Sequence, residues 1–524
     1  MNTYKRKVLT SAVLAGLGVA GSAHAIYQDP NGTGSFMIYP YYTVNSVDGA
    51  AYNTYITIVN PTTFTKVVRF RAREGRASIE VRDFNVYLSP NDVWTAAIVP
   101  TDGGGARVIT ADNSCTMPVL PTISTGLRGI DFTNILYSTG GVEFRAGIGT
   151  GLDRLREGYI EMIELATFDP AGASAALTVH NQATDTPPCG AALLSATPAT
   201  PPPIATEALP PTGGLNGTGT LLHVPTGRAM GYNAVALANW SDGVPQFGVL
   251  ADDLPNLGDS IPTSVVVGAS VGTNPASALD GSPGTLAVYR ADWLNGFEAA
   301  ASTMMHTNVI NEFVLENATR SNTDWVLTFP AKRGFVDTLG VAAVAPFTAK
   351  FLATVGACEA VTFTFFNREE RGQPVQAGGF SPGGAAAGGG GTLCWESTVL
   401  SIRNGASHTP ASGATTSGVL GSVNVTGVDI TPGIQAGWGN LQFVGTNAST
   451  GVGLVSQATS NTIILPQDGV TAPSIVTAAQ TFLGLPVTGF AVWDRTNVAV
   501  TCGTAGCMFG ELHDHKCLNF NTPT

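Results

Sequence analysis

The feature that most restricts the fold is a strand-like alternation of side chains between Tyr52 and Ile98. Apolar residues recur at every second position there, and in one run arginines fill the positions between them. That run sets Val68, Phe70 and Ala72 against Arg69, Arg71 and Arg73. A period of two places the two sets on opposite faces of a strand. The stretch therefore predicts antiparallel strands that bury one face in a core.

Similar runs follow along the chain and predict a mainly β protein. They cover residues 36–44, 107–110, 158–168, 177–180, 218–224, 232–240, 264–267, 285–289, 324–329, 359–366, 393–402, 419–428, 439–444, 462–465 and 487–493. One short helix is expected from Asn295 to about Thr307. Asn295 and Glu298 form a capping-box pattern there, and apolar residues then return at helical spacing. The predicted fold class is mainly β, with two β-sandwich regions of immunoglobulin-like type and this short helix.

A proline-rich stretch suggests how the chain is divided. Residues 186–215 carry many prolines, which cannot pair in the interior of a sheet, so a linker or long surface loop is expected there. This places an N-terminal β-sandwich domain at residues 26–185 and a C-terminal β-rich domain at residues 216–524. A glycine-rich loop is expected at residues 378–391 of the second domain.

The first residues have the pattern of an export signal. Basic residues Lys5 to Lys7 precede a short apolar run, and Ala23-His24-Ala25 resembles a signal-peptidase site. We expect residues 1–25 to be a Sec-type signal peptide and the mature protein to be extracellular or on the cell surface, with the periplasm as the alternative. No later segment reaches the roughly 20 apolar residues that a membrane-spanning helix needs.

The charge composition narrows the class of partner. The formal net charge is -12, which argues against a nucleic-acid partner. Charged residues make up 12% of the chain, whereas a typical soluble protein has about 25%. A surface of small polar residues with little charge suits exported β proteins that pack against copies of themselves, and it also suits plain secreted β-sandwiches.

Seven cysteines in an exported chain predict disulfides. Sequence order suggests that Cys115 pairs with Cys189 and Cys358 with Cys394, and that one pair forms among the last three. Those three are Cys502, Cys507 and Cys517. One geometric objection concerns Cys358 and Cys394. If residues 358–366 and 393–402 formed one simple hairpin, Cys358 would face the far end of the second strand.

Three groups of residues suggest catalysis or metal binding, each with a simpler interpretation. Ser270, in the pattern Gly268–Gly272, resembles a hydrolase nucleophile elbow, but that motif needs a parallel α/β sheet, so a glycine-rich turn is favoured. His513 and His515 with a nearby cysteine suggest a zinc site, although a disulfide-stapled terminus is favoured. Glutamates 157, 161 and 164 suggest a glycosidase acid pair, but on a strand Glu161 and Glu164 point to opposite faces.

Other residues suggest surface binding. The arginine row could hold an anion or a polysaccharide or form a subunit interface, but we favour a solvated face whose charges meet Glu80 on the neighbouring strand. Aromatic residues that could stack on sugars, although a core position is favoured, are Tyr39, Tyr41, Tyr42 and Trp94. Glu369 and Glu370, at a strand end beside Arg368 and Arg371, fit turn ion pairs as well as they fit a catalytic role. Residues 26–34 could be a strand donated to a neighbouring copy, but a first strand of the same chain is the simpler interpretation.

Several segments resemble, in the same order, those of a group of uncharacterised secreted proteobacterial proteins. They include PYYTVN, DFNVYLSPNDVW, REGYIE and TDWVLTFPAKR. The resemblance covers most of the mature chain and implies export and a shared β architecture. It implies no particular reaction or ligand.

These observations favour a non-enzymatic function. We expect a secreted structural or cell-surface protein that self-associates or joins other surface components, as part of a sheath, matrix, surface layer or filament. The alternative is an extracellular module that binds a glycan or another ligand, which requires an exposed aromatic platform. A secreted hydrolase comes third. The sequence assigns no catalytic, cofactor-binding or metal-binding residue, and no cofactor.

Overall fold

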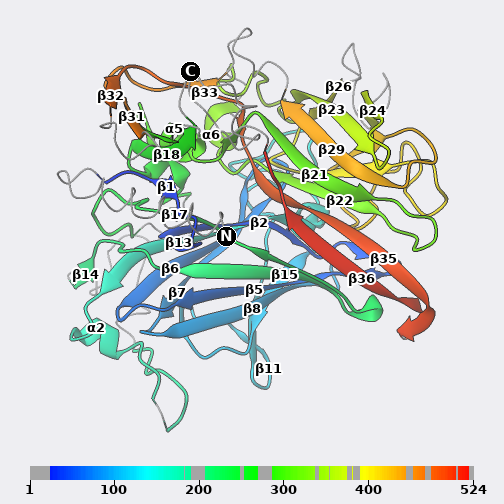
Figure 1. Ribbon diagram of the computed structural model, residues 1–524. Helices are drawn as coiled ribbons and strands as arrows, with labels where there is room; N and C mark the ends of the chain where they lie inside the picture. Colours follow the sequence, from blue (N-terminus) through cyan, green and yellow to red (C-terminus); the bar gives the residue numbers. More distant parts are fainter. Residues whose placement is uncertain are drawn as a thin grey trace.

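A computed structural model shows a mainly β protein with two sandwich-like units and a smaller sheet beside them (Figure 1). Almost every ladder is antiparallel. The immunoglobulin-like assignment stays a prediction. The structure describes residues 24–181, 183–190, 207–247, 253–269, 286–336, 342–352, 354–374, 380–381, 390–443, 453–465, 474–502 and 505–517.

The first sandwich, in the lower part of Figure 1, consists of an eight-stranded and a seven-stranded sheet. Phe70, Phe84 and Trp94 pack together between the two sheets. In spatial order the eight-stranded sheet contains β1 (Tyr27–Gln28), β17 (Val235–Ala238), β2 (Phe36–Thr43), β13 (Glu157–Phe168), β6 (Thr65–Glu74), β7 (Glu80–Leu88) and β10 (Cys115–Met117), with β14 (Ala208–Leu209) paired to β13. The seven-stranded sheet contains β11 (Thr122–Ser124), β12 (Leu127–Asp131), β9 (Ala106–Thr110), β8 (Asp92–Pro100), β5 (Asn53–Asn60), β15 (Asn216–His223) and β16 (Arg228–Asn233).

The second sandwich lies at the upper right of Figure 1. Trp325 and Phe363 meet edge to face in its core, with ring centroids 5.5 Å apart. Its five-stranded sheet contains β21 (Asn308–Val314), β29 (Ala436–Phe443), β23 (Glu359–Asn367) and β24 (Gly372–Pro374), with β26 (Gly390–Leu393) also paired to β23. Its six-stranded sheet contains β25 (Phe380–Ser381), β28 (Val425–Asp429), β27 (Ser397–Arg403), β22 (Thr323–Thr328), β35 (Thr488–Cys502) and β36 (Ala505–Asp514).

The remaining elements are small. A four-stranded sheet contains β18 (Thr263–Ala269), β19 (Leu286–Asp292), β31 (Asn461–Leu465) and β32 (Ser474–Thr477). Two-stranded ladders join β3 (Ser46–Val47) to β4 (Ala50–Ala51), β20 (Met305–His306) to β34 (Leu485–Pro486), and β30 (Gly453–Val455) to β33 (Thr481–Leu483). The helical segments are η1 (Leu152–Arg156), α2 (Ala173–Ala176), η3 (Val224–Thr226), η4 (Leu257–Asp259), α5 (Gly296–Ser302) and α6 (Arg333–Val336).

The sheets do not separate at residue 216, where the sequence suggested a domain boundary. β15 pairs with β5 from Asn216 opposite Val59 to Leu222 opposite Asn53, and β17 pairs with β2. Residues 216–238 therefore complete the first sandwich. Their alternation was visible in the sequence, but the identity of their partner strands was not.

Several local predictions need correction. The expected strand 393–402 is two strands in different sheets, β26 and β27, and the expected strand 232–240 is likewise divided between β16 and β17. Residues 177–180 form a turn after α2, and the strand expected at 419–428 begins only at Val425. The helix is confirmed as α5, capped by Asn295, whose side chain accepts from the Glu298 N–H at 3.0 Å. It ends at Ser302, because the chain then enters β20.

The two sandwiches meet through β16 and β2 of the first, which contact β36, β35 and β22 of the second. The contact contains buried polar bonds as well as apolar packing. The Thr328 hydroxyl donates to the Pro40 carbonyl at 2.6 Å, and the Ser397 N–H donates to the Gly75 carbonyl at 2.8 Å. Arg228 and Asp494 form an ion pair of 2.8 Å between β16 and β35, with both side chains almost fully buried.

Candidate functional site

The candidate site is the outer face of the seven-stranded sheet, where side chains point away from the sandwich. Burial alternates along β5, β15 and β16, so every second side chain of these strands faces outward. None of the outward side chains on β16, β15, β5 and β8 is charged. We call these residues the uncharged face: Ala229, Gly231, Asn233, Asn216, Thr218, Thr220, Leu222, Asn53, Tyr55, Thr57, Val59, Val93, Thr95, Ala97 and Val99.

The strand pairings align these residues in regular rows. One row runs Gly231, Thr220, Tyr55, Ala97. No register shift interrupts the pairings of β16 with β15, β15 with β5, or β5 with β8. In the next row, the hydroxyls of Thr57 and Thr218 lie 2.8 Å apart and share a hydrogen bond. The result is a regular surface of hydroxyl, amide and small apolar groups.

Large apolar side chains are exposed to solvent on this face. Tyr55 is 46% exposed and Val93 is 44% exposed. Arg107 and Asp131, which lie at one edge of the face, form an ion pair with each other. The outward side chains of the four strands therefore present apolar and hydrogen-bonding groups, and charged groups such as Asp112, which accepts from the Thr95 N–H, lie at the edge.

Several of the scarce charged residues are buried inside the protein. Arg69, Arg71 and Arg73 are at most 3% exposed, so the prediction of a solvated arginine face is wrong. Carbonyl groups of residues 253–255 cover this face and accept from the guanidinium groups, for example Pro255 from Arg71 at 2.5 Å. The predicted pairing with Glu80 is confirmed, since Arg71 Nε lies 2.8 Å from its carboxylate. Burial and the neighbouring Asp83 raise the pKa of Glu80 to about 7.

The three glutamates of β13 have separate structural partners. Glu161 pairs with Arg73 at 2.8 Å, and Glu164 with Lys66 at 2.7 Å. Glu157 accepts from the Tyr41 hydroxyl and from two backbone N–H groups at Val423 and Asn424. All three are almost completely buried, so they offer no acid pair to a substrate.

Both predicted disulfides with named partners are present. Cys115 bonds Cys189 and Cys358 bonds Cys394. The objection to the second bridge is removed because the chain leaves the five-stranded sheet after Cys394. Glu359 pairs with Leu393 in β23 and β26, which puts the two cysteines side by side. Cys507 is disulfide-bonded as well.

The C-terminal histidines lie in different environments. The His513 ring packs on Trp493 with centroids 4.3 Å apart. His515 is half-buried, and its Nε2 lies 2.9 Å from the Val326 carbonyl. Within the described ranges, no group of three or more His, Cys, Asp or Glu side chains is placed to hold a metal ion. The zinc hypothesis therefore gains no support, while Ser270 lies outside the described residues.

The remaining candidates are structural. The four aromatic residues proposed to stack on sugars are at most 1% exposed and belong to the core: Tyr39, Tyr41, Tyr42 and Trp94. Glu369 and Glu370 lie in the turn after β23, whereas Arg368 pairs with Glu316.

The N-terminal segment packs within its own chain. β1 pairs with β17, and the buried Ile26 N–H donates to the Thr263 carbonyl at 2.8 Å. This agrees with the simpler interpretation of the segment as a first strand.

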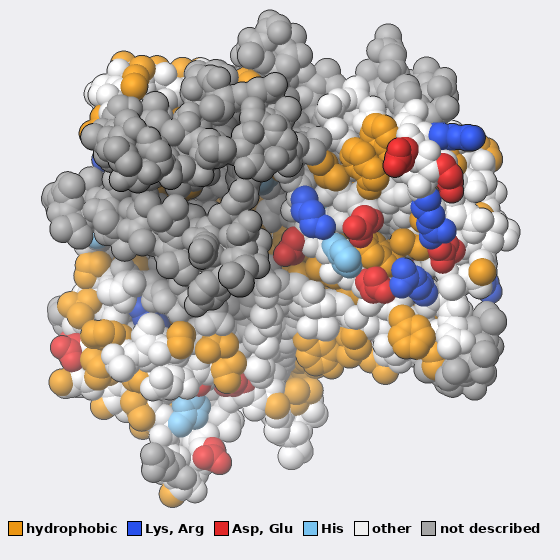
Figure 2. Space-filling view, viewed as in Figure 1, with side chains coloured by type: hydrophobic (Ala, Val, Ile, Leu, Met, Phe, Trp, Pro, Cys, Tyr) orange, Lys and Arg blue, Asp and Glu red, His pale blue; other side chains and the backbone are white. Residues whose placement is uncertain are grey.

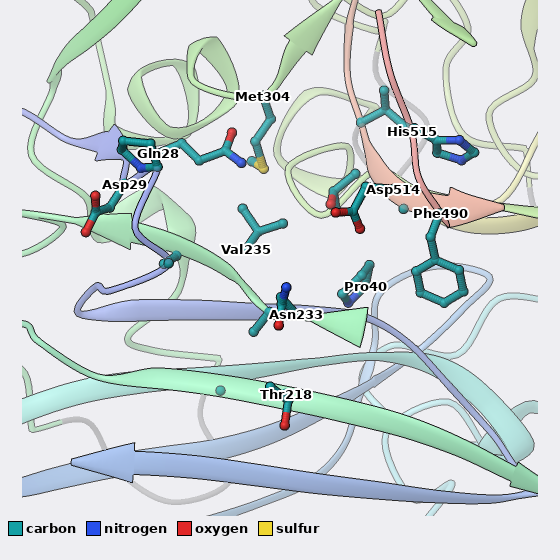
Figure 3. A pocket seen from close by; sticks show the side chains of 18 of the residues that line it. Gln28, Asp29, Pro40, Thr218, Asn233, Val235, Met304, Phe490, Asp514 and His515 are labelled. Carbon is teal, nitrogen blue, oxygen red and sulfur yellow. The ribbon is translucent and has the colours of Figure 1, made fainter. Parts of the chain in front are cut away.

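A cavity of about 630 Å³ lies where the N-terminal segment meets both sandwiches (Figure 3). Gln28, Met304 and Asp514 reach it from three parts of the chain, while the ring of His515 turns away. Burial lowers the pKa of both His306 and His515 to about 4. Such weakly basic imidazoles are poor general bases near neutral pH. The cavity therefore gives no support to the hydrolase alternative.

Sequence reasoning missed the uncharged face. The signal was present as runs such as Asn53 to Val59, in which the outward positions carry Thr, Tyr, Val and Asn but no Lys, Arg, Asp or Glu. It could be recognised only after β15 and β16 were known to lie beside β5.

No protein-family description and no curated protein matches this chain. In the part of the chain that the structure describes, no helix combines the length and the apolar character needed to cross a membrane.

Proposed function

We propose that this protein is a structural component of an extracellular surface and that it self-associates through the uncharged face. The observation that supports the proposal is the absence of outward charges on β16, β15, β5 and β8 in a chain of net charge -12. Two copies that approach through any acidic surface repel each other. On the uncharged face that repulsion is weak.

The side chains of the face also lower the free-energy cost of burying it against a second copy. Burying a charge without a partner costs several kcal/mol, whereas Thr and Asn side chains can exchange hydrogen bonds with water for bonds with a second copy. Tyr55 and Val93 supply apolar surface, and removing that surface from water stabilises the contact.

The size of the face is sufficient for a contact. Four neighbouring strands about 4.8 Å apart and up to about 27 Å long cover roughly 500 Å² on each copy. The total of about 1,000 Å² is at the lower limit of specific interfaces. A two-fold pairing of one face closes on itself as a dimer, so a filament or layer needs a second contact elsewhere.

The test is light scattering with negative-stain microscopy on residues 26–524 between about 1 and 100 µM. We expect dimers or larger ordered assemblies. Thr57→Glu places a carboxylate at the centre of the uncharged face and should weaken association at least about tenfold, because each contact would bury unpaired charge. Thr122→Glu makes the same chemical change on the exposed strand β11, outside the uncharged face, and should assemble like the unmodified protein.

Two results would contradict the proposal. One is a strictly monomeric protein over the whole concentration range. The other is an assembly that Thr57→Glu and Thr122→Glu leave equally intact.

A further inference from the structure

A second surface differs from the uncharged face in composition and lies on the other sandwich. On the right-hand side of the view in Figure 2, acidic, basic and hydrophobic side chains gather over the second sandwich. On this sandwich Trp438 of β29 and Phe366 of β23 are direct cross-strand neighbours. Their rings are stacked, with centroids 4.5 Å apart and planes 13° from parallel.

A glycine makes this stacked pair possible. Gly372 of β24 lies opposite Phe366. A Cβ atom at position 372 would come within 2.2 Å of the Phe366 ring, so the ring occupies the space that a side chain there would fill. Phe366 thereby leans over β24 and supports the indole of Trp438 from one side.

Trp438 remains 37% exposed, although tryptophans are usually buried. All seven tryptophans of the chain fall within the described residues, and the other six are buried or half-buried. An exposed indole that is fixed by a stacked partner loses little conformational entropy when a ligand binds. Its electron-rich face attracts the polarised C–H groups of a sugar ring.

Hydrogen-bonding groups lie beside the indole in the same row. Glu312 of β21 is opposite Trp438, with a side chain 53% exposed. Its carboxylate lies 3.6 Å from Nδ1 of His513, because β36 lies against β21 through a bridge between Ile310 and Lys516. A carboxylate about one strand spacing from an indole can accept hydroxyl hydrogens from the sugar that stacks there.

Polar groups continue along the same strands. Thr362 and Gln442 are cross-strand neighbours further along β23 and β29, and the threonine hydroxyl donates to the glutamine side chain at 3.3 Å. The surface is therefore long enough to contact more than one sugar of a chain.

The charges indicate which kind of polysaccharide fits. The Glu511 carboxylate is paired with Arg495 at 2.6 Å, and that of Glu316 with Arg368. Among the described residues, Glu312 has the imidazole of His513 as its only ionic partner, so its carboxylate places a negative charge beside the indole. An acidic polysaccharide would be repelled, whereas a neutral one would not.

From these contacts we infer that the surface formed by Phe366, Trp438 and Glu312 binds a neutral hexose polysaccharide. The ring stack positions the sugar, and the carboxylate fixes its hydroxyl groups. This binding site is separate from the uncharged face, so either proposal can fail without the other.

The test is affinity electrophoresis of the mature chain in native gels that contain hydroxyethyl cellulose or dextran, with alginate as the acidic comparison. We expect a neutral polymer to retard the protein and Trp438→Ala to weaken that retardation at least about tenfold, the loss of one aromatic stack. Phe64→Ala removes a loop aromatic of the same 37% exposure and should behave as the unmodified protein. Glu312→Gln, which keeps the shape of the side chain, should weaken binding severalfold and provides a second variant if Trp438→Ala misfolds.

Retardation by alginate alone, or by neither kind of polymer, would overturn the inference. Equal retardation of Trp438→Ala and Phe64→Ala would also overturn it, provided that both variants have the circular dichroism spectrum of the unmodified protein.

Discussion

The buried ion pair between the two sandwiches supports the sharpest prediction about stability. Arg228 of β16 and Asp494 of β35 are 0% and 1% exposed, and their charged atoms lie 2.8 Å apart. The guanidinium also donates to the Tyr52 hydroxyl and to the Val419 carbonyl. Removing one member of a buried pair leaves an uncompensated charge and costs about 3–5 kcal/mol. We expect Arg228→Met to lower the free energy of unfolding by that amount at pH 8.

The loss should depend on pH because of Asp494. Burial raises the pKa of its carboxyl group to about 6, although Arg228 opposes the shift. A carboxyl whose folded pKa is raised contributes stability that is present below its unfolded pKa, near 3.8, and is lost as pH rises through the folded pKa. Without the guanidinium the folded pKa rises further, so Asp494 stays protonated at pH 5. Arg228→Met should therefore cost clearly less at pH 5 than at pH 8.

Urea unfolding followed by tryptophan fluorescence measures these differences. Arg228→Met/Asp494→Leu removes both charges and should recover most of the lost stability, because no charge is left buried. Arg107→Met breaks the half-exposed pair with Asp131 and should cost about 1 kcal/mol or less. A cost for Arg228→Met no greater than that for Arg107→Met, or a cost that is the same at both pH values, would refute this prediction.

Three further predictions test other parts of the fold. Burial raises the pKa of Glu396 to about 7, so its stabilising contribution is lost as pH rises from about 4.5 through 7. Glu396→Gln should remove this pH dependence, which amounts to as much as about 3 kcal/mol in the free energy of unfolding measured with urea. An unchanged pH profile would argue against the raised pKa. Replacing both Cys358 and Cys394 by Ser opens a bridge of sequence separation 36 and should cost about 2–4 kcal/mol; as the control, the variant and the unmodified protein should unfold at the same midpoint when both are reduced, because all bridges are then open. Gly372→Ala should change tryptophan fluorescence while leaving stability within about 1 kcal/mol, since only the flexible Phe366 ring has to move; an unchanged spectrum would show that the ring does not occupy that space.

The sequence predicted the parts of this fold that depend on local pattern. The alternation of residues 68–73 identified β6 and its pairing with Glu80, and the cap at Asn295 identified α5. Burial of the arginine row was not predictable, because the carbonyls that cover it come from residues about 185 positions later in the chain. Exposure of Trp438 was equally hidden, since it depends on which strands flank β29. Both candidate surfaces thus arise from strand order, which a single sequence does not encode as a local signal.

The first strand, β1, pairs with a segment that is synthesised much later. Tyr27 pairs with Ala238, and Ile26 forms a bridge to Ser264. A chain made from its N-terminus has to carry β1 unpaired until more than 200 further residues have emerged. During that interval the strand is open to the equivalent edge of a neighbouring nascent chain. Slow emergence at high local concentration should therefore favour exchanged strands, and rapid completion of each chain should favour the closed monomeric fold.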